Sequence, residues 1–297
     1  MTAATGTGRM KGETPPAGFP PRLLLIGAQK AGTTSLAAIL DRHPKIALGR
    51  SKEPDFYARF WKRGFDWYRG NYPTDAPWLV DASPSYSAGF LGPDGEELPV
   101  AERIAAHVPD PRFLYLVRDP VRRAWSSYWH AVRFEGETEP PEKALTPASS
   151  YLRQGCYADR LAPFLERFPR EHIHVLEFES FVRDQQATLD AITDFLGLER
   201  LPLEEVVTKK NRAFRYSPLA QMLRRLFPSD RAFADFIAGA KALTPKFLRP
   251  LAARAVASDI PSMPDALRDR LATFYAPHNA RLETLLDRRF ENWTRPE

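Results

Sequence analysis

The stretch around Gly27 and Gly32 constrains the fold of this chain more than any other part of the sequence. Leu23–Ile26 is an apolar run typical of a buried strand, and Thr33–Leu40 carries apolar residues at helical spacing. The two glycines permit a tight turn in which successive N–H groups point at one small volume. A strand, a turn and a helix in this order predict an anion-binding loop at the N-terminus of the helix.

Side chains of this loop indicate what kind of anion it binds. Lys30 supplies a mobile ammonium, and Thr33, Thr34 and Ser35 add hydroxyl donors at the first turn of the helix. A nucleotide P-loop has lysine directly after its second glycine, where this chain has Thr33. Because Lys30 instead comes two residues before Gly32, the pattern favours a loop for one phosphate and the group esterified to it.

The segment Gly27–Thr34 resembles the 5′-phosphosulfate loop of the sulfotransferases that use 3′-phosphoadenosine 5′-phosphosulfate (PAPS). The resemblance implies that PAPS is the co-substrate and that Lys30 stabilises charge on the bridging oxygen as the sulfuryl group leaves. The loop residues that it implies for PAPS binding are Gln29, Lys30, Ala31, Gly32, Thr33 and Thr34. Taken alone, the segment also fits any phosphate-binding loop or a glycine-tolerant corner between a strand and a helix.

A second strand, turn and helix carry Arg118 and Ser126, which are eight residues apart. Arg112–Val117 is a strand candidate, and residues 121–130 are predicted as a helix with proline near its start. This unit can place a guanidinium and a hydroxyl on one phosphate. From Tyr115 to His130 it resembles the 3′-phosphate motif of the same family, although an isolated Arg-Asp-Pro corner is more often a structural salt bridge. For His130 itself a structural role is the favoured interpretation.

The segment Lys52-Glu53-Pro54 follows a short strand candidate at Ile46–Leu48 and is predicted to open a helix with Asp55 in its first turn. From propensity alone, Lys52 and Glu53 are ordinary solvated charges. Glycan-type sulfotransferases carry a similar segment whose glutamate is the general base, so the resemblance implies that Glu53 takes the proton of the acceptor hydroxyl. The family often has histidine where this chain has Asp55, so its acceptor contacts need not be shared.

Two stretches bear on the acceptor. Between Trp61 and Trp78 the chain is aromatic and basic; packing under a loop is the favoured interpretation, and acceptor contact is the alternative. After a strand candidate at Trp78–Asp81, the segment Ser83–Tyr86 resembles an acceptor-lining segment of the family. That family often has lysine where this chain has Ala82, which tilts the expectation toward a less acidic acceptor. Saccharides, glycolipids and hydroxylated secondary metabolites all fit.

Further elements follow from periodicity and from turn residues. A helix around Arg103 ends near Pro109. Beyond the second motif, we expect Phe134–Ser150 to be a mobile loop or insertion, with a lid as one hypothesis for it. Helices are expected at Tyr151–Phe168, Leu189–Leu198 and Leu219–Leu226, and a strand at His172–Glu179. A basic connector at Lys209–Tyr216 and a C-terminal helix at Arg281–Trp293 complete the expected elements.

No metal site is predicted. His172 and His174 fall on the same side of their strand, but no further ligand spacing completes a zinc site. Cys156 has no base or activating group signalled nearby, so we expect it to pack.

Composition indicates the class of the domain, the charge of its ligands and its cellular location. The 297 residues, 43% of them hydrophobic and 27% charged, are typical of one large soluble α/β domain, and the net charge of +5 favours anionic ligands without requiring nucleic acid. Residues 1–20 lack an apolar core and are expected to be a disordered tail before a single domain at 21–297. One cysteine and no apparent membrane anchor suit a cytoplasmic protein, and the Ala, Arg and Pro content fits a bacterial source.

These inferences converge on a three-layer α/β/α fold with a central parallel sheet, in which both phosphate motifs lie at strand carboxyl ends. The predicted activity is transfer of a sulfuryl group from PAPS to an acceptor hydroxyl, with no metal required. Two alternatives stay open: an ATP-dependent small-molecule kinase of the P-loop type, and a nucleotide-binding protein without catalysis. The sequence does not indicate the oligomeric state.

Overall fold

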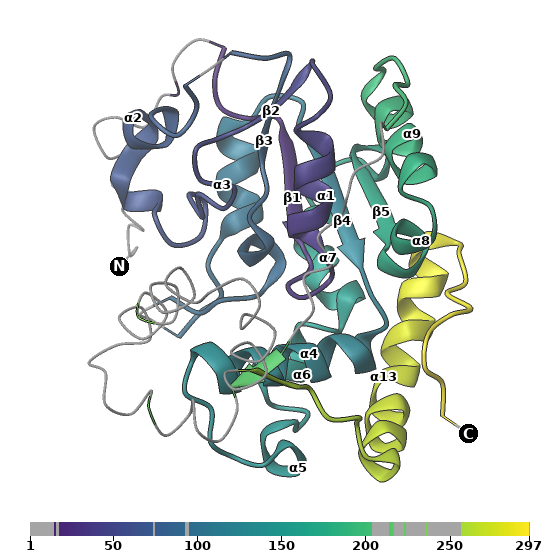
Figure 1. Cartoon of the computed structure of the whole chain (residues 1–297). Coiled ribbons are helices and arrows are strands. Elements are labelled where there is room, and N and C mark those ends of the chain that lie inside the picture. The colour runs from purple at the N-terminus through teal and green to yellow at the C-terminus, as the bar shows by residue number, and fades with distance from the viewer. Residues whose placement is uncertain are drawn as a thin grey trace, which may run out of the picture.

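A five-stranded parallel sheet forms the centre of the computed structural model, which describes residues 18–73, 75–92, 95–203, 214–216 and 257–296 and residues 15, 223 and 236 (Figure 1). The strand order is β2-β3-β1-β4-β5, and each hydrogen-bonded pair is parallel. The strands are β1 (Leu23–Gly27), β2 (Ile46–Leu48), β3 (Trp78–Asp81), β4 (Arg112–Val117) and β5 (Ile173–Glu177).

Helices flank this sheet, which confirms the predicted three-layer α/β class. The α-helices are α1 (Thr33–Leu40), α2 (Gly64–Arg69), α3 (Val100–His107), α4 (Pro120–Phe134), α5 (Pro141–Ala144), α6 (Ser150–Arg153), α7 (Tyr157–Leu165), α8 (Phe178–Arg183), α9 (Gln185–Leu196) and α13 (Asp265–Leu286). Short 3₁₀ helices are η1 (Trp61–Arg63), η2 (Pro84–Ser87) and η3 (Arg170–His172). In Figure 1, α1 lies in front of β1, and α4 crosses beyond the carboxyl ends of the strands.

The apolar runs became strands because both faces of the sheet are covered. All five residues of β1 are buried, as are the last five of β4, so no polar alternation is needed along either strand. On one side Phe113 packs against the rings of Phe164 and Phe168, with centroids 5.4 and 4.7 Å away. The two strands that carry the phosphate motifs are therefore the most deeply buried part of the fold.

The chain is already buried in the fold just before β1. Phe19 is 6% exposed, and its ring lies 5.1 Å from that of Tyr68 and 5.8 Å from that of Tyr72. Pro20 is also buried. The packed body thus includes two residues that the sequence placed in the tail, and most of residues 1–17 lie outside the described residues.

Two expected helices differ in the structure. No helix opens at Asp55, because this residue has a φ of +52° and its carbonyl accepts the N–H groups of Arg59 and Phe60 in a turn. The helix expected over Tyr151–Phe168 is broken into α6 and α7. At the break, a Cβ on Gly155 would lie 2.7 Å from the hydroxyl of Tyr275, so the backbone and this side chain are in close contact.

Other boundaries shifted by a few residues. The strand expected to reach Glu179 ends at Glu177, where α8 begins, and α9 starts four residues earlier than expected and ends at Gly197 in the left-handed conformation. Helix α13 spans Asp265–Leu286 and so begins and ends earlier than the predicted C-terminal helix.

A two-stranded antiparallel sheet lies apart from the central sheet and was not expected. It pairs β6 (Phe214–Tyr216) with β7 (Ala257–Asp259), and β6 contacts α4. Strand β6 covers the end of the predicted basic connector, whereas residues 209–213 and most of the helix expected at 219–226 lie outside the described residues.

Candidate active site

The loop after β1 forms the turn that its glycines predicted. Gly32 has a φ of +95° and Lys30 a φ of +67°, both left-handed. Gly32 also lies against the ring of Phe178, which a Cβ at this position would approach to 2.7 Å. Among the described residues no side chain caps α1, so the first N–H groups of this helix are available to an anion.

One residue of the predicted phosphate-binding set, Ala31, makes a hydrogen bond within the turn itself. Ala31 is fully buried, and its N–H donates to the carbonyl oxygen of Ala28 at 3.1 Å. Its amide is therefore already used inside the turn. The other loop residues predicted for the donor, Gln29, Lys30, Gly32, Thr33 and Thr34, all line one cleft.

Lys30 is held by a partner that the sequence analysis did not assign. Its Nζ lies 3.1 Å from Nδ1 of His130, which comes one hundred residues later on α4. Burial, and next the charges of Arg133 and Arg118, lower the pKa of Lys30. Burial and the Lys30 charge lower the pKa of His130 to about 4, so at neutral pH the imidazole is uncharged and accepts the hydrogen bond.

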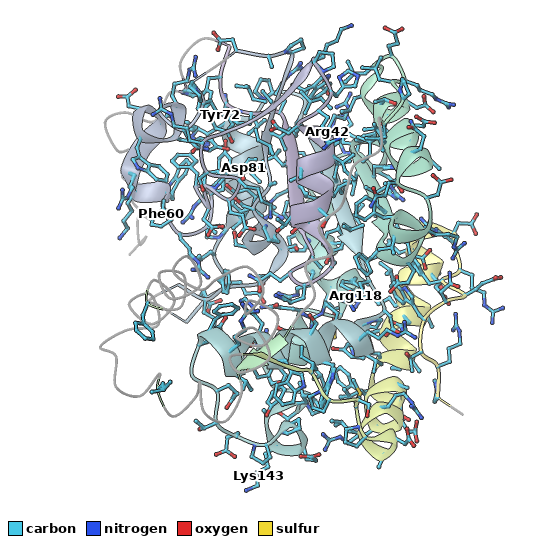
Figure 2. The ribbon with its side chains drawn as sticks, in the orientation of Figure 1. Arg42, Phe60, Tyr72, Asp81, Arg118 and Lys143 are labelled. Carbon is cyan, nitrogen blue, oxygen red and sulfur yellow. The ribbon has the colours of Figure 1, made fainter. Side chains whose placement is uncertain are left out.

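The corner after β4 brings Arg118 to the first loop, as its position in Figure 2 between the strand ends and α4 suggests. Its Nη1 donates to the carbonyl oxygen of Lys30 at 3.1 Å, and its Cζ lies 4.8 Å from the centroid of the Phe178 ring. The hydroxyl of Tyr157 donates to the Arg118 carbonyl oxygen at 2.6 Å. Nε of Arg118 is buried and has no partner among the described residues, as a site for an incoming phosphate oxygen requires.

Asp119 fixes this corner from inside the protein. It is fully buried, and its Oδ1 accepts the N–H groups of Val121 and Arg122 at 2.9 and 3.2 Å, which caps α4. Its Oδ2 accepts the N–H of Thr294 at 2.9 Å and the hydroxyl of the same residue at 2.5 Å. The Arg-Asp-Pro corner thus has a structural aspartate and, beside it, an arginine that faces the cleft.

The candidate base, Glu53, lines the same cleft, with its side chain 44% exposed. Its Oε1 accepts a hydrogen bond from Nζ of Lys52 at 2.5 Å. The same ammonium donates to the hydroxyls of Thr33 and Thr34, at 3.4 and 3.3 Å. Lys52 therefore links the candidate base to the loop after β1, and with 21% of its side chain exposed it is not an ordinary solvated turn charge.

A buried polar network holds the backbone beneath Glu53. The carboxylate of Asp81, labelled in Figure 2, accepts hydrogen bonds from the hydroxyls of Tyr68 and Tyr86, each at 2.6 Å, and of Ser83 at 2.5 Å. Ser83 Oγ in turn accepts the N–H of Asp55 at 3.0 Å. Burial raises the pKa of Asp81 to about 6 against these hydrogen bonds, so near neutral pH the carboxylate is ionised.

The Asp55 side chain bonds to Ser85, on η2. Ser85 Oγ donates to its Oδ1, and burial raises the pKa of Asp55, with this hydrogen bond acting in the opposite direction. Asp55 is not among the residues that line the cleft. Its contacts are those of a group that fixes the turn after Glu53.

These elements enclose a cleft of about 1850 Å³. Pockets for single small ligands usually measure about 300–1000 Å³, so the cleft has room for a nucleotide donor and an acceptor together. Lys30, Glu53, Arg118 and Ser126 all line it. Its lining has two glutamates and eight lysines or arginines, which are Lys30, Arg59, Arg118, Arg122, Arg133, Arg153, Arg160 and Arg268. Four of these arginines form ion pairs with carboxylates outside the lining: Arg153 and Arg160 with Glu97, Arg122 with Asp119 and Arg268 with Asp265.

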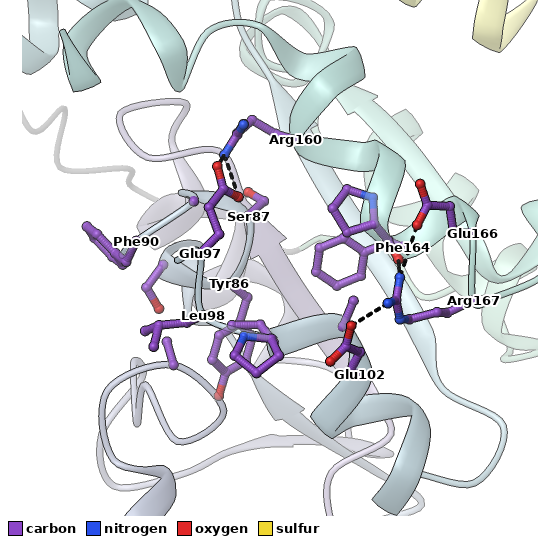
Figure 3. Close-up of a pocket in the computed structure, with 17 residues that line it drawn as sticks. Tyr86, Ser87, Phe90, Glu97, Leu98, Glu102, Arg160, Phe164, Glu166 and Arg167 are labelled. Atoms are coloured by element: carbon purple, nitrogen blue, oxygen red, sulfur yellow. Dashed lines mark hydrogen bonds and ion pairs between the residues drawn. The ribbon is translucent and has the colours of Figure 1, made fainter. Parts of the chain in front are cut away.

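A smaller pocket of about 260 Å³ adjoins the cleft and shares Gly89, Phe90 and Arg160 with it (Figure 3). Figure 3 shows ion pairs of Arg160 with Glu97 and of Arg167 with Glu102 around an apolar floor that includes Phe164. The pocket contains no residue of the two phosphate motifs. It is a separate pocket beside the cleft, lined in part by residues of η2.

Most of the aromatic stretch packs in the interior, as favoured, although Trp67 is 36% exposed. Phe65, Tyr68 and Tyr72 are buried, and Phe56 stacks on Tyr68 with centroids 4.2 Å apart. Among the residues described here, none of the aromatic side chains between 61 and 78 lines the cleft. The stretch therefore supports the segment that carries Glu53.

The segment Phe134–Ser150 contains α5 and is tied to its surroundings. The hydroxyl of Tyr128 donates to the Glu139 carbonyl oxygen at 2.9 Å, and that of Tyr151 donates to Glu137 Oε2 at 2.9 Å. Leu145 is 1% exposed in a second apolar cluster beside α4 and α13. Both ends of the segment reach the cleft, since Phe134, Glu135, Ala148 and Ser150 line it.

The histidines and the cysteine outside the cleft have packing roles. His174 stacks on Phe195 at 5.2 Å, and His172 Nε2 lies 3.5 Å from Asp110. Burial raises the pKa of Cys156 to about 11, which keeps the thiol protonated. In the described part of the chain Cys156 comes near Asp159 and His278, but Arg281 already pairs with Asp159.

Comparisons with known proteins agree with this geometry. Residues 56–202 match the sequence model described as "Sulfotransferase family". The chain is 30% identical over 294 residues to heparan sulfate glucosamine 3-O-sulfotransferase 6 of Mus musculus, covering 94% of this chain and 73% of that protein. With its Homo sapiens counterpart it shares 31% identity over 276 residues, which cover 88% of this chain and 70% of the relative.

A solved structure shares the fold. The sulfotransferase from Alicyclobacillus acidocaldarius aligns with a TM-score of 0.64 at 24% identity, covering 93% of this chain and 99% of that chain. The chain belongs to the PAPS-dependent sulfotransferase family, and it is a sulfotransferase with PAPS as its co-substrate.

None of the described helices is both long and apolar enough to cross a membrane.

Proposed function

We propose that this protein transfers the sulfuryl group of PAPS to a hydroxyl of an acidic saccharide, with Glu53 as the general base. In this proposal the N–H groups from Gly32 to Thr34 hold the 5′-phosphate, and Arg118 and Ser126 hold the 3′-phosphate. Lys30 stabilises the negative charge that develops on the bridging oxygen as the S–O bond breaks. The observation that supports it is the convergence of three distant segments, at 30, 53 and 118, on one cleft.

The protonation states suit these roles. Neutral His130 accepts a hydrogen bond from the Lys30 ammonium and so holds it in place. Burial and the charges of Arg133 and Arg118 lower the pKa of Lys30 and outweigh the charges of Glu135 and Glu53, which raise it. Glu53 has 44% of its side chain exposed and lies where an acceptor hydroxyl can reach it. The proton of the hydroxyl passes to Glu53 while the acceptor oxygen bonds to sulfur, and the electron pair of the broken bond stays on the phosphate of 3′-phosphoadenosine 5′-phosphate (PAP).

The charge of the cleft supports an acidic acceptor over the less acidic one that Ala82 suggested. Ala82 is fully buried and its N–H donates to the Lys52 carbonyl oxygen, so its side chain does not face the acceptor. Positive groups beyond those assigned to PAPS, among them Arg59 and Arg133, line the same cleft. The named relatives act on heparan sulfate, an acidic polysaccharide. A cytoplasmic location is also part of the proposal and rests on the single cysteine.

The donor site is tested by calorimetric titration of the protein with PAP in EDTA, with ATP as the comparison. We expect metal-independent binding of PAP that Arg118→Ala weakens about 10- to 100-fold, because a hydrogen bond to a charged group contributes about 1.5–3 kcal/mol. Arg42→Ala is the matched control, since Arg42 is exposed and lies outside the cleft. PAP affinity unchanged in Arg118→Ala, or an Mg²⁺-dependent preference for ATP, would contradict the assignment.

The acceptor and the base need a second assay. With radiolabelled PAPS, we expect transfer to heparan sulfate and not to a neutral glucan, and we expect Glu53→Gln to lose turnover while it retains PAP affinity. Equal transfer to the neutral glucan would refute the acidic acceptor, whereas full turnover by Glu53→Gln would refute the base.

A further inference from the structure

Lys52 is the one side chain in the described structure that contacts both halves of the proposed reaction centre. Its Nζ bonds to Glu53 Oε1 at 2.5 Å and to the hydroxyls of Thr33 and Thr34 at 3.4 and 3.3 Å. Thr33 and Thr34 belong to the loop for the 5′-phosphosulfate, and Glu53 faces the acceptor. The ammonium therefore lies between Glu53 and the first turn of α1.

The backbone around Lys52 is fixed from two sides, so this location is built into the fold. The Lys52 carbonyl oxygen accepts the N–H of Ala82 at 3.2 Å, directly after β3. Next to it, the Ser51 N–H donates to Asn71 Oδ1 at 2.7 Å, and Asn71 Nδ2 donates back to the Ser51 carbonyl oxygen at 3.1 Å. With 21% of its side chain exposed, Lys52 is less accessible than Glu53.

The chemistry of the transfer calls for a donor at this location. The sulfuryl group lies in line between the bridging oxygen of PAPS and the acceptor oxygen, with three further oxygens around the sulfur. Lys30 is assigned to the bridging oxygen, which leaves these sulfuryl oxygens to other donors. An ammonium has three N–H donors and no acceptor, so Lys52 can exchange its bonds to the two threonine hydroxyls for sulfuryl oxygens while it still holds Glu53.

We infer that Lys52 is a second catalytic cation, which binds the sulfuryl oxygens during transfer and orients Glu53 toward the acceptor. The inference rests on the proposed roles of the loop and of Glu53. In the step itself the acceptor oxygen–sulfur bond forms, the sulfur–bridging oxygen bond breaks, the acceptor proton goes to Glu53 and the electron pair leaves with PAP. Lys52 gives up no proton and acts through its charge and its hydrogen bonds.

The test compares two ligands that differ by the sulfuryl group alone. Calorimetry with PAP and with PAPS, without acceptor, measures the affinity ratio of the two in the wild type, in Lys52→Met and in Lys52→Arg. We expect Lys52→Met to bind PAP within about twofold of the wild type, and to lose about tenfold or more of its PAPS affinity relative to PAP. Lys52→Arg keeps a positive donor and should recover part of the ratio.

A rate measurement completes the test. In the heparan sulfate assay, Lys52→Met should lower turnover about 100-fold, the usual effect of removing one donor to a developing charge. Lys62→Met, an exposed lysine on η1, is the matched control. The inference would be overturned if the ratio of PAPS affinity to PAP affinity is the same in Lys52→Met as in the wild type. If both affinities fall by the same factor, the inference is also overturned, because Lys52 then has a structural role. The affinity ratio needs no base, so a failure of the Glu53 assignment, seen as full turnover by Glu53→Gln, is distinguishable from a failure of Lys52.

Discussion

At the scale of single residues, the site depends on contacts between side chains far apart in the sequence. The Lys30–His130 hydrogen bond joins the two predicted phosphate motifs, and the Lys52–Thr34 bond joins the segment of the proposed base, Glu53, to the first of them. Each motif could be found from its own spacing, because a strand, a turn and a helix are encoded locally. Neither His130 nor Lys52 has such a local signal, since each obtains its partner only when the sheet brings separate segments together.

His130 gives a prediction at this scale. His130→Ala removes the acceptor that holds the Lys30 ammonium, so we expect turnover to fall about three- to tenfold, the effect of one hydrogen bond of about 0.5–1.5 kcal/mol. His130→Gln offers an amide oxygen and should recover part of that loss. Initial rates at saturating PAPS measure the effect, with His172→Gln as the control outside the cleft. A rate in His130→Ala equal to that of the wild type would show that Lys30 needs no such partner.

The same variant tests the charge state of His130. Its pKa is about 4 in the folded protein and about 6.5 in an unfolded chain, so the unfolded chain binds more protons between these values. This group therefore lowers stability as the pH falls from about 6.5 to about 4, and it has no such effect at higher pH. Thermal melts should show that His130→Ala loses less stability than the wild type across that window.

At the scale of elements, the turn before α1 is the most demanding part of the donor site. Gly32→Ala places a Cβ at a φ of +95° and within 2.7 Å of the Phe178 ring. We expect a loss of stability of about 1–3 kcal/mol and weaker PAP binding, because Phe178 also supports Arg118. Melting temperature and PAP titration measure the two effects.

Gly136→Ala is the matched control for this prediction. Gly136 has a φ of +78°, and a Cβ there would meet no atom within 4 Å. It therefore carries the backbone strain without the collision and should leave PAP affinity unchanged. If both variants lower stability equally and neither affects PAP binding, close packing at Gly32 is not what the donor site requires.

Elements also show where sequence patterns lose their predictive value. The five strands of the main sheet were predictable because each is an apolar run or follows a turn signal. For β1 and β4, burial on both faces requires such a run, whereas the edge strand β2 is only partly buried. The break between α6 and α7 was not predictable from the sequence. The amphipathic pattern continues through Gly155, but the Tyr275 side chain occupies the space beside this glycine. Asp55 was expected in a helix, but Ser83 and Ser85, about thirty residues later, hold it in a turn.

At the scale of the whole molecule, the donor site is completed by the far end of the described chain. Thr294 donates two hydrogen bonds to Asp119, which caps the helix that carries Ser126 and His130. Thr294→Val keeps the shape and the backbone N–H but removes the hydroxyl from a buried carboxylate. We expect PAP affinity to fall about two- to tenfold and stability by about 1–3 kcal/mol. Titration and thermal melts would measure both losses.

Thr284→Val is the control for that prediction, since Thr284 is exposed on α13 and its hydroxyl bonds only within its own helix. It should leave PAP affinity as in the wild type. PAP affinity unchanged in Thr294→Val would mean that the corner at Arg118 holds without support from the C-terminal segment.

The bond between Asp119 and Thr294 also has a consequence for how the enzyme is made. The two residues are 175 positions apart, so a ribosome that has just added Asp119 must add that many more before the partner exists. Until then Oδ2 of Asp119 lacks both hydrogen bonds from Thr294 and has the Arg122 guanidinium, 3.5 Å away, as a partner. If Thr294 supports the donor site as predicted, the nucleotide site reaches full affinity only when the segment around Thr294 has been synthesised and has folded back.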